Sequence, residues 1–196
     1  MTTKLKSQSI ESILREHEAA FKASFGVENV KLLEKISEQI AEAFRRGNKL
    51  LLCGNGGSAA DAQHIAAEFI GRFKKERKSL PAIALTTDSS VLTALANDYS
   101  YETVFSRQVE GLGEKGDILV AISTSGTSKN IVEAVKRAKD LGLITIGFTG
   151  KSGGDLKKLC DFNFSAGSLK TPHVQEMHIT ALHAVSEAVE DTLFPA

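Results

Sequence analysis

The sequence predicts an α/β protein with a doubly wound parallel sheet. Strand-like and helix-like runs alternate after Gly47, and repeated strand–helix units of this kind build parallel sheets. The strand candidates are mostly continuous apolar runs, as expected where helices cover both faces of a sheet. Of the 196 residues, 42% are hydrophobic and 24% are charged, which is ordinary for a globular protein.

The first 47 residues are predicted to be helical, because apolar residues recur there at steps of three and four. Gly26 breaks this pattern and Gly47 stops it. The predicted strands are residues 49–53, 82–85, 117–122, 143–148 and 161–164. The predicted helices are residues 58–72, 89–97, 101–111, 128–140, 153–159 and 172–193. No linker, repeat or composition shift divides the chain, so we expect a single domain over residues 1–196, with N-terminal helices to about residue 47 and the sheet core with the final helix from about residue 48.

Charge and hydropathy narrow the classes of function. Lys and Arg together number 24, as do Asp and Glu, so the formal net charge is zero, whereas binders of nucleic acid or anionic membranes are usually basic. No apolar run approaches the roughly 18 residues that span a bilayer, and the N-terminus has no apolar signal core. We therefore expect a cytoplasmic protein with no nucleic-acid or membrane partner.

The loop after the first predicted strand is Gly54-Asn55-Gly56-Gly57-Ser58. In parallel sheets ligands bind beyond the carboxyl ends of the strands, and the N–H groups at a helix start attract anions. The loop also matches the dinucleotide fingerprint. That fingerprint requires an acid about 20 residues on, at the end of the second strand, where this chain has Leu85 followed by threonines. An anion or sugar-phosphate contact is therefore favoured over NAD binding.

The loop after the third predicted strand, residues Ser123 to Ser128, contains five hydroxyl side chains and Gly126. Hydroxyls and the N–H groups of a helix start both donate to phosphate oxygens, and Gly126 permits a tight turn. A helix N-cap alone would need one or two hydroxyls. The number of hydroxyls favours a phosphate seat made of neutral donors.

His64 and Glu68 are four residues apart and share one face of a predicted helix. They could ligate a metal together, or form an ordinary pair on the helix surface, and spacing leaves both interpretations open. The C-terminal helix adds further donors: His173, Gln175, Glu176, His178 and His183. Gln175 and His183 are eight residues apart, so their side chains point about 80° apart around a straight helix, which does not favour binding of one ion by both.

Two other polar segments are ambiguous. Asn97 and Asp98 end an apolar helical stretch, where a helix stop and contacts to substrate hydroxyls are equally favoured. The charged run 74–78 is interpreted as a solvated loop.

Six motifs carry a resemblance to a known family. They are CGNGGSAADAQHIAAEF, LTTDSSVLTALANDY, FSRQV, STSGTSKNI, GFTGKSGG and a QEMH–H pattern near the C-terminus. Together they closely resemble the phosphoheptose isomerases, which are sugar isomerase (SIS) domain proteins, over nearly all of residues 30–194 and in the same order. The resemblance implies a three-layer α/β/α sandwich with a five-stranded parallel sheet, and a homotetramer with active sites at subunit interfaces.

The resemblance also implies an activity and a set of site residues. The reaction is conversion of sedoheptulose 7-phosphate to D-glycero-D-manno-heptose 7-phosphate through an enediol, toward the heptose of bacterial lipopolysaccharide. One zinc ion per subunit is expected, and the positions that match the family's ligands are His64, Glu68, Gln175 and His183. Glu68 is the expected base and His183 its acid–base partner. The expected substrate contacts are Asn55, Gly56, Gly57, Glu68, Asn97, Asp98, Ser123, Thr124, Ser125, Ser128 and Gln175.

A different class of function stays open beside this one. A replication-initiator-associating protein has the same fold, is similar in these loops, and shares the TLFP found here at residues 192–195. That relative lacks the full zinc and catalytic set, whereas this chain retains all four residues. The alternative is therefore a non-catalytic SIS-domain binding protein. A third possibility is an isomerase or sensing domain for another sugar phosphate.

Overall fold

A computed structural model of the chain describes residues 9–195. Its sheet has five strands, all parallel, in the order β2-β1-β3-β4-β5. Because β2 and β3 lie on opposite sides of β1, the winding reverses between β1 and β3, and this switch point is where such sheets bind ligands. The strands are β1 (Leu50–Gly54), β2 (Ala82–Ala84), β3 (Ile118–Ser123), β4 (Ile144–Thr149) and β5 (Phe162–Ser165).

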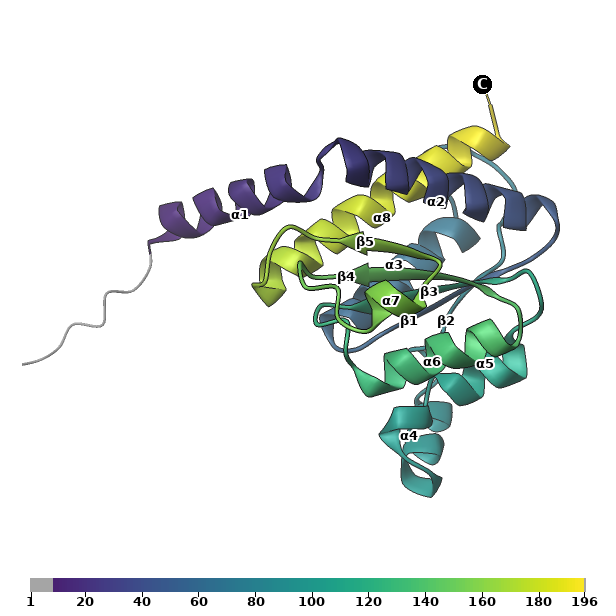
Figure 1. The fold of residues 1–196 in the computed structure, drawn as a ribbon. Coiled ribbons are helices and arrows are strands. Elements are labelled where there is room, and N and C mark those ends of the chain that lie inside the picture. The colour runs from purple at the N-terminus through teal and green to yellow at the C-terminus, as the bar shows by residue number, and fades with distance from the viewer. Residues whose placement is uncertain (1–8, 196) are drawn as a thin grey trace, which may run out of the picture.

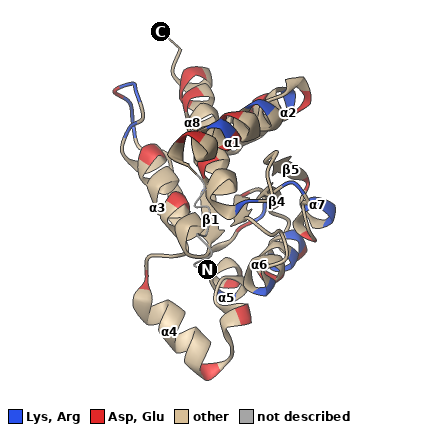
Figure 2. Cartoon of the chain, turned by 90° about the vertical axis from the view of Figure 1, so that its left-hand side faces the viewer, with Lys and Arg blue, Asp and Glu red and all other residues tan. Residues whose placement is uncertain are grey.

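Helices cover both faces of the sheet and complete three layers (Figure 1). One layer contains α2 (Val27–Arg45), α3 (Gly57–Ile70) and α8 (Thr171–Leu193), with α1 (Ile10–Ser24) against α8. The opposite layer contains the 3₁₀ helix η1 (Tyr101–Thr103), α5 (Ser106–Leu112), α6 (Lys129–Asp140) and α7 (Leu156–Leu159). The helix α4 (Ser89–Asp98) stands off from the sheet (Figure 2). Within residues 9–195, no helix is both long enough and apolar enough to cross a membrane.

Strand β1 illustrates how the sequence builds two cores on one sheet. Leu50 and Leu52 pack in the apolar cluster beneath α2, α3 and α8, whereas Leu51 and Cys53 pack in the cluster beneath α5 and α6. All four side chains are buried, and burial of one aliphatic side chain contributes about 1.5–3 kcal/mol. Burial on both faces explains why the strand is continuously apolar rather than alternating.

The predicted elements are confirmed with two differences. Each strand lies within one residue of its predicted bounds. The helix predicted at 101–111 is divided into η1 and α5, because the chain turns between them to bury Val104 and Phe105. The helix predicted at 153–159 is shorter, because Gly153 and Gly154 have φ values of +75° and +54°, outside the helical region. Of the predicted N-terminal helices, the part over residues 1–8 lies outside the described residues.

The loops that follow β3 and β4 are locked together through backbone contacts. Gly126 has a φ of +70°, and a Cβ atom there would lie 2.2 Å from the carbonyl oxygen of Gly153. The carbonyl oxygen of Gly126 accepts hydrogen bonds from the N–H groups of Asp155 (2.9 Å) and Leu156 (3.1 Å). A side chain at position 126 would therefore separate two loops that hold each other in place.

We expect Gly126→Ala to lower the free energy of unfolding by at least about 1 kcal/mol, because alanine meets both the positive φ and the Gly153 carbonyl. Gly111→Ala in α5 is the matched control. No atom lies within 4 Å of its added Cβ, so this change should stabilise the protein by up to about 1 kcal/mol. Denaturant unfolding of both variants measures the difference, and a Gly126→Ala protein as stable as the wild type would contradict the described packing.

Candidate functional site

Asn55 and Asn130 connect the two loops at the switch point. The register of β1 with β3 places the residue after Gly54 beside Ser123. Each asparagine donates its side-chain amide to the other's carbonyl oxygen, both at 2.9 Å, and the hydroxyl of Tyr101 also donates to Asn55 Oδ1 at 3.1 Å. Asn130 lies in the first turn of α6 and is 4% exposed. The pair thus fixes the GNGGS loop against the helix that follows β3.

The hydroxyls of the loop after β3 converge on one another. Ser123 Oγ lies 3.1 Å from Ser128 Oγ and 3.4 Å from Ser125 Oγ, and the N–H of Thr127 donates to Ser125 Oγ at 3.2 Å. Ser128 occupies the N-cap position of α6, yet its side chain makes no cap hydrogen bond. Ser128 therefore does not act as a simple N-cap. The three serine hydroxyls instead form a cluster of neutral donors at a helix N-terminus, which suits a phosphate group.

Backbone contacts hold Thr124 in this loop. Its carbonyl oxygen accepts a hydrogen bond from the N–H of Gly150 at 3.0 Å, so the loop after β4 supports the phosphate seat from one side. Nearby, the Lys129 ammonium is paired with Glu102 at 2.7 Å. The loop therefore presents hydroxyl and N–H groups beside a lysine that is paired with a carboxylate.

Helices α3 and α8 bring His64, Glu68 and His183 together. The Nε2 atoms of His64 and His183 lie 2.8 Å apart, and Nε2 of His64 lies 3.4 Å from Glu68 Oε1. One ligand atom of each residue lies within 4.8 Å of the others. Partial burial lowers the pKa of His183, the neighbouring His64 lowers it further, and Glu68 opposes the shift. A neutral imidazole with a carboxylate close by can both hold a metal and transfer a proton.

Gln175 of α8 faces the start of α3. A Cβ atom at Gly57 would lie 2.5 Å from Gln175 Nε2, so the end of this glutamine packs directly on the start of α3. Gly57 contacts Gln175 near the starts of α3 and α8, and His64 contacts His183 further along both helices. The two helices therefore run side by side in the same direction. The 80° offset between Gln175 and His183 is therefore no obstacle to both residues facing α3, and His64, Glu68 and His183 converge within one chain.

Asp61 was not singled out by the sequence analysis, although it lies one helical turn before His64. Burial raises its pKa to about 6, while His64 opposes the shift. Its Oδ2 atom is buried and has no hydrogen-bond partner within residues 9–195. The acid three residues before His64 was the available signal, because that spacing places both side chains on one helix face.

A buried ion pair fixes the loop beyond the end of α3, which carries several basic residues (Figure 2). Arg77 Nε donates to Glu190 Oε1 at 2.9 Å, and the two side chains are 1% and 2% exposed. Glu190 also accepts hydrogen bonds from the backbone N–H groups of Phe73, Lys74 and Lys75 at 2.8–3.1 Å. The interpretation of residues 74–78 as a solvated loop is wrong for Arg77, whose side chain is buried. Its partner lies 113 residues away, so local sequence could not indicate the pairing.

The Arg77–Glu190 ion pair and the loop it holds, called the clamp below, contact the candidate site at two places. Arg77 donates to the carbonyl oxygen of Glu68 at 2.7 Å, which fixes the last turn of α3. Phe73 stacks on the His183 ring, with centroids 5.7 Å apart and planes at 30°. Both Glu68 and His183 are thereby positioned by residues that the sequence analysis did not identify.

Asn97 and Asp98 end α4, as the predicted helix stop requires. Both residues are exposed, and the Asn97 amide donates to Asp98 Oδ1 at 2.9 Å. Because α4 stands off from the sheet (Figure 2), their contact with a substrate remains a prediction.

A family model described as "SIS domain" matches residues 17–150 of this chain. At the level of sequence, the chain is 58% identical over 163 residues to the phosphoheptose isomerase of Roseiflexus sp. (strain RS-1), covering 83% of each chain. It is 49% identical over 183 residues to phosphoheptose isomerase 1 of Campylobacter jejuni, covering 93% of this chain and 97% of that one.

Solved structures give the same result for the fold. The phosphoheptose isomerase of Neisseria gonorrhoeae superimposes with a TM-score of 0.84 at 39% identity, over 92% of this chain and 98% of that one. The phosphoheptose isomerase of Francisella tularensis superimposes with a TM-score of 0.87 at 34% identity, over 94% and 100% of the two chains. The similarity thus extends over both the sheet and the helices that carry the candidate site.

We expect Glu190→Ala to lower the free energy of unfolding by about 3–5 kcal/mol, because it leaves the buried Arg77 guanidinium without its partner. Glu187→Ala is the matched control on the same helix. Glu187 pairs with Lys74 at the surface, where its loss should cost at most about 1 kcal/mol. Denaturant unfolding measures both, and equal losses for the two variants would contradict a buried clamp.

The clamp should also depend on pH. Burial raises the pKa of Glu190, but the three backbone N–H groups and Arg77 lower it by more, so the net pKa lies below its ordinary value. A lowered folded-state pKa gives stability that is complete above the unfolded value of about 4.3 and is lost as pH falls below it. The stability difference between wild type and Glu190→Gln should therefore shrink in acid. A difference that grows as pH falls would refute this sign.

Proposed function

Because this chain belongs to the SIS domain family and, within it, to the phosphoheptose isomerases, we propose that it converts sedoheptulose 7-phosphate to D-glycero-D-manno-heptose 7-phosphate through an enediol. Two observations support the proposal: His64, Glu68 and His183 converge between α3 and α8, and serine hydroxyls cluster in the loop after β3. A reactive carboxylate and a phosphate seat are the two parts that isomerisation of a sugar phosphate requires.

The phosphate end of the substrate would lie at the carboxyl edge of the sheet. Its 7-phosphate would accept hydrogen bonds from Ser123, Thr124, Ser125 and Ser128 and from the start of α6. Asn55, Gly56, Gly57 and Gln175 would contact the sugar between the phosphate and Glu68, with Asn97 and Asp98 as further contacts. The amide pair of Asn55 and Asn130 supports this placement, because it holds the two loops at a fixed separation.

Isomerisation requires one proton to move between carbons and another between oxygens. In the proposed reaction Glu68 takes the proton from C1, which gives the enediol, and returns a proton to C2. His183 donates a proton to O2 and accepts the proton from O1, so the proton balance closes. Partial burial and the neighbouring His64 lower the pKa of His183, which eases the release of its proton to O2.

The donor set fits one zinc ion per chain. Two imidazole nitrogens and a carboxylate oxygen are ligands that zinc prefers, and two ligand atoms of a tetrahedral ion with bonds of about 2.1 Å lie roughly 3.4 Å apart. The separation of His64 Nε2 from Glu68 Oε1 matches this value, whereas the two histidine Nε2 atoms, 2.8 Å apart, would have to separate to hold the ion. His64, Glu68 and His183 would hold the ion, with Gln175 as the fourth ligand. When bound, zinc would polarise the substrate carbonyl and stabilise the negative charge of the enediolate.

The proposal also covers the oligomeric state of the protein and the use of its product in the cell. Exposed apolar side chains lie on α1 and α2 and form a surface that another copy of the chain can cover: Ile10, Ile13, Leu14, Phe21, Val27 and Val30. We propose a homotetramer of single-domain chains with active sites at subunit interfaces, and burial of these side chains between copies would favour its assembly. The product would serve heptose synthesis for lipopolysaccharide in the cytoplasm.

The names of the relatives favour catalysis over the non-catalytic binding alternative. The cheapest discriminator is incubation of the pure protein with sedoheptulose 7-phosphate, followed by detection of the aldose. Absence of turnover, together with capture of a replication initiator, would favour the binding protein instead.

We expect Glu68→Gln to lower kcat by at least about 100-fold, because it removes the proposed base while keeping the side-chain shape. Glu76→Gln, on the exposed part of the following loop, is the matched control and should retain wild-type kcat. Aldose formation from sedoheptulose 7-phosphate measures both. A folded Glu68→Gln protein with near-normal turnover would refute the assignment.

Ser125→Ala should lower kcat/KM for sedoheptulose 7-phosphate by about 10–100-fold, the value of one hydrogen bond to a charged group. The same variant should leave the slow reaction of unphosphorylated sedoheptulose unchanged. Ser79→Ala, at an exposed position before β2, is the control. Equal losses with both substrates would place the phosphate elsewhere.

A further inference from the structure

We propose a second divalent-cation site, at the contact between α1 and α8, with His17, His173 and Glu176 as ligands. One ligand atom from each residue lies within 4.8 Å of the others. Two imidazoles and a carboxylate are the donor set of zinc and of similar borderline metal ions. The proposal does not depend on the isomerase assignment, because none of these residues belongs to the His64–Glu68–His183 cluster.

Glu176 lies close to both histidines, and its carboxylate is hydrogen-bonded to His17. Glu176 Oε2 lies 2.5 Å from His17 Nδ1 and 3.6 Å from His173 Nδ1. The longer distance is beyond hydrogen-bond range but close to the roughly 3.4 Å between two ligand atoms of a tetrahedral zinc ion. The rings of His17 and His173 meet edge to face, with centroids 5.8 Å apart, so both rings border the same small volume.

His173 provides independent support. Its side chain is 7% exposed, and its buried Nδ1 atom has no hydrogen-bond partner within the described part of the chain. An unpartnered buried polar atom costs about 1–3 kcal/mol. Because this atom points toward Glu176, a bound cation would remove that cost.

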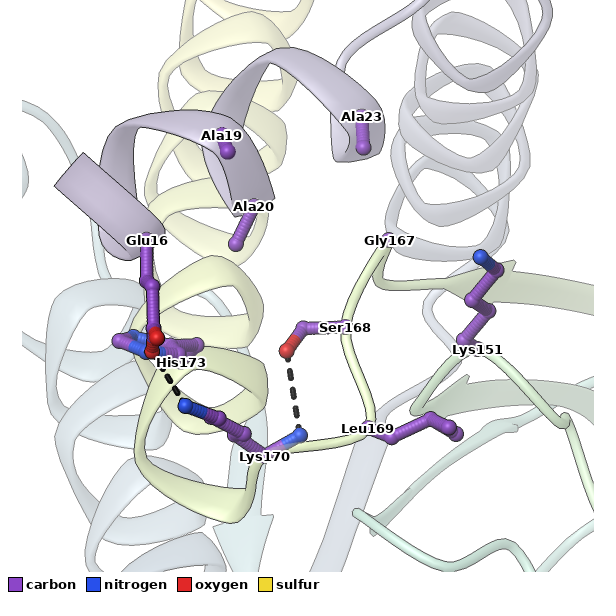
Figure 3. Close-up of a pocket in the computed structure, with 10 residues that line it drawn as sticks. All are labelled: Glu16, Ala19, Ala20, Ala23, Lys151, Gly167, Ser168, Leu169, Lys170 and His173. Carbon is purple, nitrogen blue, oxygen red and sulfur yellow. Dashed lines mark hydrogen bonds and ion pairs between the residues drawn. The ribbon is translucent and has the colours of Figure 1, made fainter. Parts of the chain in front are cut away.

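The other ring nitrogen of His173 faces a second carboxylate, at a distance beyond direct hydrogen bonding. Glu16 Oε2 lies 3.7 Å from His173 Nε2, and Lys170 forms an ion pair with the same carboxylate (Figure 3). This carboxylate adds negative charge beside the ring. Two carboxylates and one ammonium leave a net negative charge of one around the histidines, which favours a cation.

The surroundings allow an ion to enter. A pocket of about 490 Å³ opens between α1 and the loop before α8, and it is lined by Glu16, Lys170 and His173 among others (Figure 3). The buried side chains of α1 are Ala20 and Ser24, a small anchor for a helix of 15 residues. A metal held jointly by α1 and α8 would therefore fix the position of α1 on the rest of the protein.

The test is calorimetric titration of the full chain with Zn²⁺ alone. The double variant His64→Gln/His183→Gln serves as background, because it removes histidine ligands from the first cluster. We expect this protein to bind one Zn²⁺ per chain, and His17→Gln or Glu176→Gln in the same background to abolish that binding. Glu18→Gln, an exposed α1 carboxylate paired with Lys22, is the matched control and should bind as the background does. Glu16→Gln should weaken binding, because it removes negative charge beside the His173 ring.

Zinc content of otherwise wild-type protein gives a second measurement that does not need the double variant to fold. Glu176→Gln should hold one Zn²⁺ per chain fewer than wild type, with isomerase kcat unchanged. The proposal is overturned if the background protein binds no Zn²⁺, or if His17→Gln and Glu176→Gln bind as much as their parents. Loss of zinc only on substitution of His64 and His183 would leave the first site alone, which separates this result from a failure of the proposed function.

Discussion

The pairing of β1 with β3 is the constraint on which the rest of the site depends. This pairing puts the winding reversal between two buried strands, so the GNGGS and STSGTS loops emerge side by side at the same edge of the sheet. The reciprocal amide hydrogen bonds of Asn55 and Asn130 then hold the two loops together. The apolar strands are buried on both faces, and this leaves the edge as the place where polar side chains can gather.

A second constraint acts on the helices that carry the reactive groups. Glu68 and His183 lie on α3 and α8, which meet side by side, and the buried Arg77–Glu190 pair joins the ends of both helices. Phe73, held by the same clamp, stacks on His183. Such support from outside the site is what keeps a carboxylate and an imidazole in a fixed relation, and a small displacement of either would weaken proton transfer.

The sequence predicted those features that depend on local pattern. The strand Leu50–Gly54 is a continuous apolar run, and the hydroxyl-rich loop at Ser123 follows such a run, so both were visible without a structure. The shared face of His64 and Glu68 follows from their spacing. That spacing could not identify His183 as their neighbour, because the contact spans 119 residues. Arg77–Glu190 and the orphaned nitrogen of His173 were invisible for the same reason: each is defined by a partner or a burial that only the folded chain provides.

In the proposed reaction Glu68 transfers a proton from C1 to C2 by way of an enediol intermediate. Turnover of sedoheptulose 7-phosphate in D₂O, with the product examined by NMR, tests it most directly. Because the proton held on Glu68 exchanges with solvent, we predict D-glycero-D-manno-heptose 7-phosphate that carries deuterium at C2. Absence of the aldose would contradict the proposed chemistry, whereas incomplete deuteration would mean that Glu68 returns part of the C1 proton before it exchanges.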